Sequence, residues 1–276
     1  MDFDSGSLDG LRAGMLTLVG MPSDENSTFM RGPALAPARI REVLYNGSAN
    51  LYAENGIDLG TEPHFRDLGD LTLENRKGAF QHIEQTVGRL LDRDVQVLTL
   101  GGDHAITYPI VRAYAAKYPG LSILQFDAHP DLYDEYEGNR YAHACPFARI
   151  MEEELASRLV QVGIRTMNSH QRDQAARFGV EVIEMRHWRP GTRLDLQGPV
   201  YLSLDMDALD PAYAPGVSHH EPGGLSTREV LHLIQELDAA IVGADIVEVN
   251  PTRDPHGITA MVGAKFLKEI AGCMLA

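Results

Sequence analysis

The feature that most constrains this fold is the segment 121–131, which reads LSILQFDAHPD. Its apolar first half predicts a buried strand, and its three potential metal ligands gather at the carboxyl end. Asp127 and His129 are two residues apart, so they point to the same side of an extended backbone. Pro130 ends ladder pairing and bends the chain, which lets Asp131 reach the same point. One imidazole and two carboxylates are therefore expected to converge at a strand end.

The rest of the chain alternates apolar runs with amphipathic stretches. We expect strands at 16–22, 95–100, 121–127, 160–165, 180–185, 200–205 and 241–247, with an edge strand near 64–70. We expect helices at 38–45, 75–91, 106–117, 147–155, 169–178, 227–237 and 258–274, with Ser226 as an N-cap. This alternation is typical of a parallel sheet covered on both faces, whose ligands bind beyond the carboxyl ends of the strands. The long loops at 23–37, 131–146 and 207–225 are where we expect the function.

Length and charge limit the class of protein. With 276 residues, 44% of them hydrophobic, we predict a single domain over 1–276, with 1–15 as a loose N-terminal tail. No run of eighteen apolar residues could span a bilayer and no signal peptide is recognisable, so we expect a cytoplasmic protein. A net charge of −15 disfavours nucleic acids and anionic membranes as partners, since both attract basic surfaces. Two cysteines, Cys145 and Cys273, are too few for a disulfide scaffold.

Two further strand ends carry residues of the same kind. The segment 203–211 reads SLDMDALDP, so Asp205 and Asp207 follow an apolar strand and face the same way. The Gly-Gly turn after Leu100 delivers His104 at a third strand end. Because buried carboxylates need compensation, we interpret these groups as ligands of two divalent cations rather than a structural polar cluster. The six predicted ligands are His104, Asp127, His129, Asp131, Asp205 and Asp207.

The ligand types also indicate the metal and the chemistry. Oxygen and imidazole donors without a thiolate favour manganese, with zinc, iron, nickel and cobalt as substitutes. Two metal ions about 3.5–4 Å apart are a common device for activating water at neutral pH. The sequence therefore predicts a hydrolase.

Three signatures make the chain resemble the ureohydrolases, a family that includes agmatinase, arginase, guanidinobutyrase, guanidinopropionase and formimidoylglutamase. They are GGDH at 101–104, DAHPD at 127–131 and SLDMDALDP at 203–211. The resemblance runs from about residue 16 to the C-terminus and departs from the family at Pro130, where threonine is more usual and no ligand is affected. It implies a three-layer α/β/α sandwich with a central, mostly parallel sheet, two Mn²⁺ ions per chain, and a homotrimer or homohexamer.

The resemblance also assigns roles to the ligands. His104 and Asp131 would bind one manganese ion, and His129 and Asp207 the other. Asp127 and Asp205 would bridge the two ions, which makes Asp127 a catalytic residue as well as a ligand.

Two residues outside the ligand set are candidates for substrate and proton handling. The family binds a guanidinium through a glutamate after the last strand, where Glu248 stands, and a carboxylate pairs bidentately with that planar group. Asp245, two residues earlier, is interpreted as support behind the site. His143 matches the loop histidine that similar enzymes use to shuttle a proton to the departing amine. A small cationic guanidino substrate would yield urea and an amine.

For the substrate itself we expect agmatine, which would give putrescine and urea. Arginases of the family carry a Ser-Gly-Asn-x-His-Gly pattern, whereas here three residues separate Asn139 from His143. The runs 140–149, 164–165 and 211–216 look more like those of agmatinases. Glu135 and Glu137 could receive a distal ammonium or be solvated loop charges. The activities of arginase, guanidinobutyrase, guanidinopropionase and formimidoylglutamase are alternatives, as is a non-catalytic metal-binding regulatory relative.

Other readings stay open at this point. The segment 217–221, VSHHE, stands where many relatives have Gly-Thr-Pro, so His219 and His220 either reshape the pocket or lie at its rim. Cys145 near His143 is compatible with amidino transfer or deimination through a thiolate, although the six metal-type ligands would then be unexplained. A single-metal, deacetylase-like hydrolase is less consistent with two bridging aspartates.

Overall fold

The computed structural model describes residues 8–73 and 76–276, and its centre is a twisted parallel sheet. The strands stand in the order β2-β1-β3-β8-β7-β4-β5-β6, and every pairing between neighbours is parallel. They are β1 (Leu16–Met21), β2 (Phe65–Asp70), β3 (Gln96–Gly101), β4 (Ser122–Phe126), β5 (Arg158–Ile164), β6 (Glu181–Glu184), β7 (Pro199–Asp205) and β8 (Ala240–Val247).

The burial of the strands follows their place in the sheet. Strands β1 and β4 are buried along their whole length, as expected for parallel strands covered on both faces. The edge strands β2 and β6 are partly exposed and carry more charged residues. The sequence predicted each of these strands to within a few residues of its ends.

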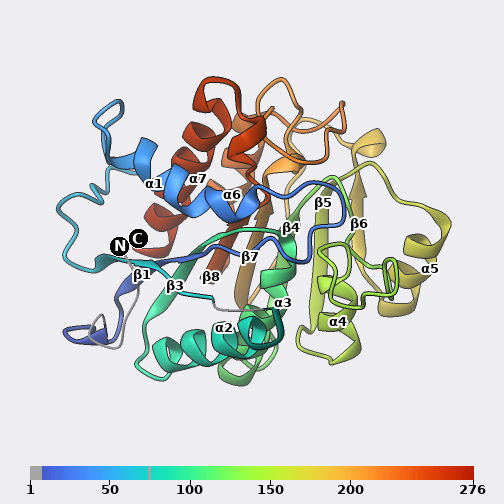
Figure 1. Ribbon diagram of the computed structural model, residues 1–276, viewed down its shortest axis with the longest axis horizontal. Coiled ribbons are helices and arrows are strands. Elements are labelled where there is room, and N and C mark those ends of the chain that lie inside the picture. Colours follow the sequence, from blue (N-terminus) through green and yellow to red (C-terminus); the bar gives the residue numbers. More distant parts are fainter. Residues whose placement is uncertain (1–7, 74–75) are drawn as a thin grey trace.

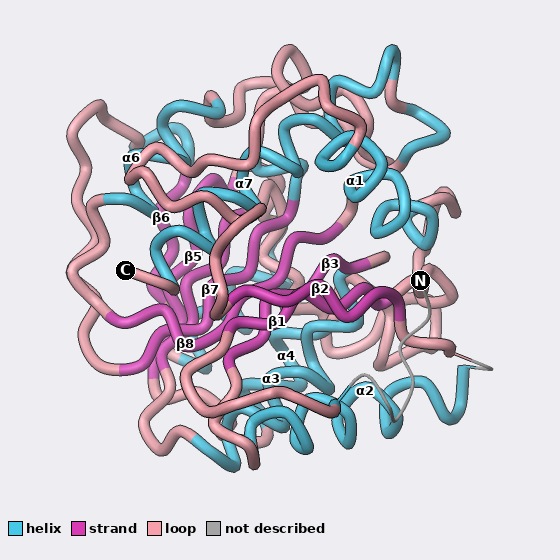
Figure 2. The backbone as a smooth tube through the Cα atoms, turned by 90° about the vertical axis from the view of Figure 1, so that its left-hand side faces the viewer, coloured by secondary structure: helices cyan, strands magenta, loops and turns pink. Residues whose placement is uncertain are grey.

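Helices cover the sheet in two layers (Figure 1). One layer contains α1 (Ala36–Tyr45), α6 (Thr227–Gln235) and α7 (Ile258–Met274). The other contains α2 (Arg76–Leu91), α3 (Thr107–Lys117) and α4 (Pro146–Glu152), with α5 (Ser169–Phe178) beside it. Each layer packs on its own hydrophobic cluster, and the view turned by 90° shows the sheet between them (Figure 2). The predicted three-layer α/β/α sandwich is confirmed, with a sheet that is wholly parallel among the described residues.

Local sequence signals set several helix ends. Ser226 Oγ accepts a hydrogen bond from Glu229 N at 3.2 Å, and Glu229 Oε2 accepts one from Ser226 N at 2.8 Å. This capping box at the start of α6 satisfies two backbone donors, a contribution of about 0.5–2 kcal/mol for a cap. The predicted N-cap is therefore confirmed.

The N-terminal segment differs from the expectation. Leu8 and Leu11 pack against the hydrophobic cluster under α2 and α3, and Arg66 donates a hydrogen bond to the carbonyl of Asp9 at 2.7 Å. A loose tail over 1–15 is thus wrong for residues 8–15, because two apolar side chains spaced three apart anchor them. Residues 1–7 lie outside the described residues. The single domain over 1–276 remains a prediction.

The strand order explains where the candidate residues meet. Strands β3, β8, β7 and β4 are neighbours in the middle of the sheet, although they are far apart in sequence. The connection from β3 to β4 passes over the positions that β8 and β7 occupy in the sheet. The connections that leave the neighbouring strands β3 and β8 lead to α3 and α7, which lie in opposite helix layers, so they diverge at this point. In parallel α/β sheets such a point leaves a crevice at the carboxyl ends of the strands. Apart from those of the loop at 131–146, the predicted site residues end or follow one of these four strands, or lie on β8.

Candidate active site

A tight turn after β3 places the first ligand. A Cβ on Gly102 would lie 1.7 Å from the carbonyl oxygen of Ser23, so only glycine allows the two backbones to approach this closely. Asp103 N donates to that same carbonyl at 2.8 Å, and the Asp103 carboxylate accepts from Ala105 N at 3.2 Å. The turn therefore fixes both the start of the short helix that carries His104 and the neighbouring loop.

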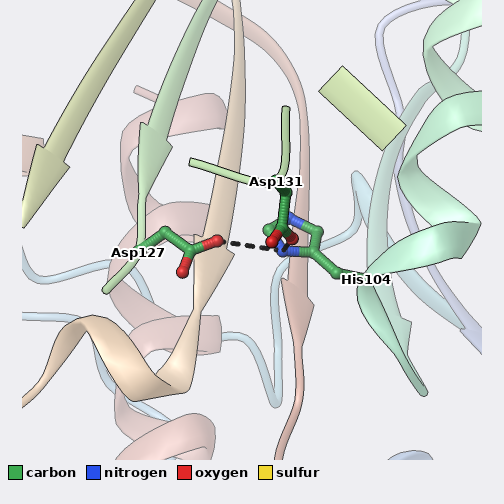
Figure 3. Close-up of side chains that lie close together, drawn as sticks. All are labelled: His104, Asp127 and Asp131. Carbon is green, nitrogen blue, oxygen red and sulfur yellow. Dashed lines mark ion pairs between the residues drawn. The ribbon is translucent and has the colours of Figure 1, made fainter. Parts of the chain in front are cut away.

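His104 faces three carboxylates at once. Its Nδ1 atom lies 3.1 Å from Asp127 Oδ2, 3.1 Å from Asp131 Oδ2 and 3.2 Å from Asp205 Oδ2. The side chains of His104 and Asp127 are fully buried. Figure 3 shows the side chains of Asp127, Asp131 and His104 converging, with a dashed line for the ion pair between Asp127 and His104.

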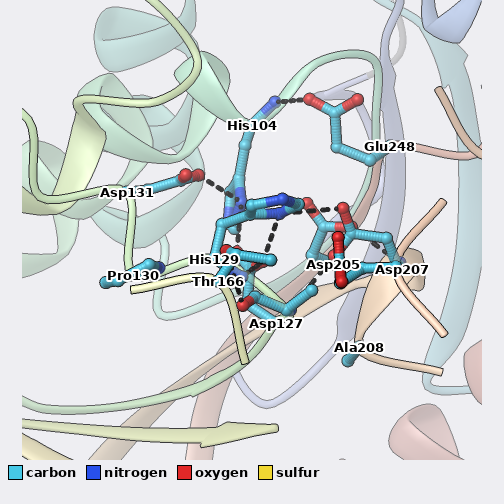
Figure 4. Close-up of polar contacts among 12 residues, drawn as sticks. His104, Asp127, His129, Pro130, Asp131, Thr166, Asp205, Asp207, Ala208 and Glu248 are labelled. Carbon is cyan, nitrogen blue, oxygen red and sulfur yellow. Dashed lines mark hydrogen bonds and ion pairs between the residues drawn. The ribbon is translucent and has the colours of Figure 1, made fainter. Parts of the chain in front are cut away.

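A second group shares Asp127 with the first. His129 Nδ1 lies 3.1 Å from Asp207 Oδ2 and 3.5 Å from Asp127 Oδ1. Ligand atoms of His104, Asp127 and Asp131 lie within 4.8 Å of one another, and so do those of Asp127, His129 and Asp207. The structure thus brings all six predicted ligands together at one end of the sheet, in two groups joined by a common carboxylate (Figure 4).

Backbone amides orient these carboxylates. His129 N donates to Asp127 Oδ1 at 2.6 Å, and Asp207 N donates to Asp205 Oδ1 at 2.8 Å. Ala128 N donates to Asp207 Oδ1 at 3.1 Å. Each bond holds one oxygen of a carboxylate in place, and the Oδ2 atoms of Asp205 and Asp207 are left facing the imidazoles. The Asp-x-His and Asp-x-Asp spacings therefore serve both to place the ligands and to aim them.

The hydrogen bonds of His104 test whether the site fits a metal ion. Ser203 Oγ donates to Asp245 Oδ1 at 2.7 Å, so its lone pair accepts from His104 Nε2, 2.9 Å away. In this tautomer His104 Nδ1 carries a lone pair, and it has no hydrogen-bond partner among the described residues. A lone pair aimed at three carboxylates is repelled by them unless a positive charge, such as that of a metal ion, lies between them. The donor set fits a divalent metal ion.

The electrostatics of the cluster lead to the same conclusion. Burial and the neighbouring Asp127 raise the pKa of Asp131 to about 6. Burial, with Asp207 and Asp127, raises the pKa of Asp205 well above its usual range. Burial alone lowers the pKa of His104, but the three carboxylates outweigh it and raise the pKa well above the ordinary value. Without added positive charge these groups cannot all ionise together.

Replacing Ser203 tests this tautomer argument. In a Ser203→Ala variant His104 loses the acceptor for its Nε2 proton, and we expect manganese affinity to fall about 10–100-fold. Equilibrium dialysis followed by metal analysis measures the effect. Ser122→Ala is the matched control, since it removes a buried serine near the other end of neighbouring β4 and should leave the affinity unchanged. Equal affinities for the two variants would contradict the argument.

Glu248 and His143 form a second unit above the metal ligands. Glu248 Oε1 accepts from the backbone N of His104 at 2.9 Å and lies 2.7 Å from His143 Nδ1. Thr28 N donates to His143 Nε2 at 3.2 Å, so in the neutral ring the proton sits on Nδ1 and points at Glu248. Burial lowers the pKa of His143, but Glu248 outweighs it and the pKa rises to about 9. The structure therefore joins the two predicted residues in one ion pair.

Two carboxylates of the site have a left-handed backbone. Asp131 has φ 50° and Glu248 has φ 63°, conformations that cost about 1–3 kcal/mol for residues other than glycine. Glu248 N donates to Gly102 O at 2.9 Å, which helps to hold this conformation. This backbone conformation directs both carboxylates into the crevice, and its cost lowers the stability of the folded protein.

A cavity of about 310 Å³ lies over the ligands. His129, His143, His219 and Glu248 line it, and its lining contains several carboxylates but no lysine or arginine. Glu221 contributes one of those carboxylates, whereas the predicted Glu135 and Glu137 are exposed and do not line the cavity. Their exposure favours the other interpretation of Glu135 and Glu137, that they are solvated loop charges.

The thiolate alternative does not fit the structure. Cys145 is fully buried, does not line the cavity, and its Sγ approaches the carbonyl of Asn139 at 3.7 Å. Burial raises the pKa of its thiol to about 12, whereas a nucleophilic cysteine needs a lowered pKa. Cys145 instead precedes α4 as part of the core.

Sequence reasoning missed several supporting residues. Gln125 Nε2 donates to Asp127 Oδ2 at 2.7 Å and to the carbonyl of His129 at 3.2 Å, and Gln161 Nε2 donates to Gln125 Oε1 at 2.6 Å. A glutamine inside an otherwise apolar buried strand was a signal that could have identified both. Thr28 gave no such signal, because only the folded chain brings its loop onto His143.

The predicted Asp245 lies behind the site. It is fully buried, accepts from Ser203 through one oxygen, and accepts through the other from Thr107 Oγ1 at 2.8 Å and Tyr201 OH at 2.7 Å. Because Ser203 also accepts a hydrogen bond from His104 Nε2, Asp245 helps to orient the His104 ring.

Comparisons with known proteins identify the family. Residues 15–273 match the model of the arginase family. An arginase of Glycine max is 48% identical over 275 residues, which cover 94% of this chain and 79% of the relative. An agmatinase of Bacillus cereus is 34% identical over 264 residues, which cover 92% of this chain and 90% of the relative. The solved arginase of Medicago truncatula superposes with a TM-score of 0.89 at 44% identity, covering 97% of this chain and 89% of that chain.

No helix among the described residues is both long and apolar enough to cross a membrane. The family match covers nearly the whole chain, the fold agrees with that of a solved arginase, and the acidic strand ends carry the expected ligand types. On these grounds the chain belongs to the arginase family of ureohydrolases, hydrolases that act on carbon–nitrogen bonds other than peptide bonds.

Proposed function

We propose that this protein hydrolyses L-arginine to L-ornithine and urea, with two Mn²⁺ ions held by the six ligands at the strand ends. The observation that carries the choice of substrate is the difference in identity: 48% to an arginase and 34% to an agmatinase over nearly the same length of this chain. The comparisons thus favour arginine over the agmatine expected from the sequence. Identity across the whole chain outweighs the spacing of one loop pattern.

Glu248 is the proposed guanidinium-binding residue. Its Oε1 already accepts from His104 N and pairs with His143, while its Oε2 has no hydrogen-bond partner among the described residues. Burial raises the pKa of Glu248, but His143 and the His104 amide outweigh it and lower the pKa, so the carboxylate is ionised. An ionised, oriented carboxylate can accept two N–H groups of a guanidinium and hold its carbon over the metal ligands.

His143 is the proposed proton donor to the leaving amine. Burial lowers and Glu248 raises the pKa of His143, to about 9, so the ring is a cation at neutral pH and becomes neutral when it gives up its Nδ1 proton. That proton lies against Glu248, the residue proposed to hold the guanidinium, and therefore close to the nitrogen that departs. The hydroxyl of Thr28, 2.8 Å from Nε2, holds the ring in this orientation. The chemistry that bound manganese supplies is activation of water as a nucleophile. Water adds to the guanidinium carbon, the bond to the alkyl nitrogen breaks, and that nitrogen leaves as an ammonium.

Agmatine is the second candidate, because one observation favours it. No lysine or arginine lines the cavity to pair with an α-carboxylate, a group that agmatine lacks. Rates of urea release from the two compounds decide between them.

The test is kcat/KM for L-arginine, agmatine, 4-guanidinobutyrate and 3-guanidinopropionate with manganese-loaded protein, and with a chelator-treated sample as control. We expect metal-dependent urea, with arginine preferred at least tenfold over the others. Preference for agmatine would reject the proposed substrate and restore the second candidate. Urea release that survives the chelator would reject the metal mechanism.

Two further expectations remain predictions. The assembly is predicted to be a homotrimer or homohexamer, and the location is predicted to be cytoplasmic. Sedimentation and fractionation measure them.

A further inference from the structure

One wall of the cavity has no role in the proposed mechanism. The ring centroid of His219 lies 5.5 Å from that of His143, 5.6 Å from that of His129 and 5.4 Å from that of Phe29. Phe29 is 63% exposed, whereas His143 is buried beside Glu248. His219 therefore spans the cavity from the ligand groups to the surface.

The backbone around His219 is tied to the strand end that delivers Glu248. Asn250 N donates to the carbonyl of Gly216 at 2.7 Å, and Asn250 Nδ2 donates to Ser218 Oγ at 2.9 Å. Ser218 and Asn250 are both buried, so these bonds are shielded from water. Because Asn250 follows Glu248 by two residues, one short piece of chain sets the position of both the carboxylate and the ring.

The chemistry of the cavity indicates what the ring meets. Apart from the histidines and the predicted metal ligands, the charged residues in the lining are the carboxylates Glu221 and Glu248, which favour a cation. His219 makes no hydrogen bond to any described residue, so its contacts in the site are those of its ring. A guanidinium is planar and weakly hydrated, and it packs well against an aromatic face.

We propose that His219 is a specificity-determining residue whose ring packs against the guanidinium group and adjoining methylenes of the substrate while Glu248 binds the edge of that group. The inference rests on the proposed function only for the guanidino group, which arginine and agmatine share. It gives the histidine at this position a role in affinity that neither the metal ligands nor His143 supplies.

The test compares His219→Ala, which removes the ring, with His219→Phe, which keeps an aromatic face without the nitrogens. A contact of this kind is worth about 0.5–2 kcal/mol, so His219→Ala should raise KM about 2–30-fold and change kcat by less than that. His219→Phe should stay within about twofold of the wild-type KM. His220→Ala is the matched control, because His220 is exposed and bonds to the carbonyl of Pro215 at 2.6 Å.

Three results would overturn the proposal: an unchanged KM in His219→Ala, a fall in kcat at constant KM, or a Phe variant as impaired as the Ala variant. Failure of the proposed substrate is a separate outcome. If the wild type releases urea from agmatine alone, arginine is rejected, and the same variants are compared on agmatine. If it releases urea from neither, calorimetric binding of millimolar guanidinium chloride replaces KM, and His219→Ala must bind it more weakly than His219→Phe.

Discussion

A Glu248→Gln variant is expected to lose roughly 10²–10⁴-fold in kcat/KM, since breaking a buried ion pair costs about 3–5 kcal/mol. The substitution is selective. Glutamine keeps an oxygen that can accept from the backbone of His104 and from His143, the two bonds that Glu248 Oε1 makes. Only the other oxygen changes, to an amide nitrogen that repels a guanidinium. Urea release at several substrate concentrations measures the loss.

The control for this variant is Glu236→Gln at the exposed end of α6, which should be as active as the wild type. Circular dichroism of Glu248→Gln should match the wild type as well. A folded Glu248→Gln protein with near-normal kcat/KM would remove Glu248 from guanidinium binding and leave the cavity without its proposed anchor.

The second large effect is expected for Asp127→Asn. Asp127 belongs to both ligand groups, so its loss should reduce bound manganese from two ions per chain to one or none. Loss of metal assistance is worth several kcal/mol, so urea release should fall by about 10³-fold or more. Metal analysis after dialysis and the urea assay measure the two effects on one sample.

Misfolding is distinguished by the circular dichroism of the metal-free protein. Asparagine has nearly the same size and shape as aspartate, so the spectrum of metal-free Asp127→Asn should match that of the metal-free wild type. Asp173→Asn, an exposed change on α5, should alter neither metal content nor activity. Two tightly bound ions in the Asp127→Asn protein would contradict the shared-ligand arrangement.

Much of the fold and the ligand set could be predicted because short-range patterns determine them. Apolar runs that end in paired polar residues gave β4 and β7, and a period of two fixed which side chains face one way. The parallel sheet then brought Asp127, Asp205 and His104 to a common edge, and their contacts of 3.1–3.2 Å follow from that topology.

Other features depend on contacts between distant segments. Thr28 meets His143 across 115 residues, and His104 meets Ser203 across 99, so no local pattern contains either pair. No local pattern identifies the residues that would bind the substrate either. Glu135 and Glu137 were candidates because of their loop, yet the folded loop turns them outward and Glu221 from another segment lines the cavity instead. The side chains that contact the far end of a substrate are few and lie on loops, where the spacing of residues in the sequence does not determine their positions.

The most direct test of the central claim is a titration of metal-free protein with Mn²⁺ while urea release from L-arginine is recorded. Two ligand groups joined by Asp127 predict activity that rises until two ions are bound per chain and then stays constant. Full activity at one ion per chain, or urea release without any bound metal, would contradict a two-metal hydrolase built on these strand ends.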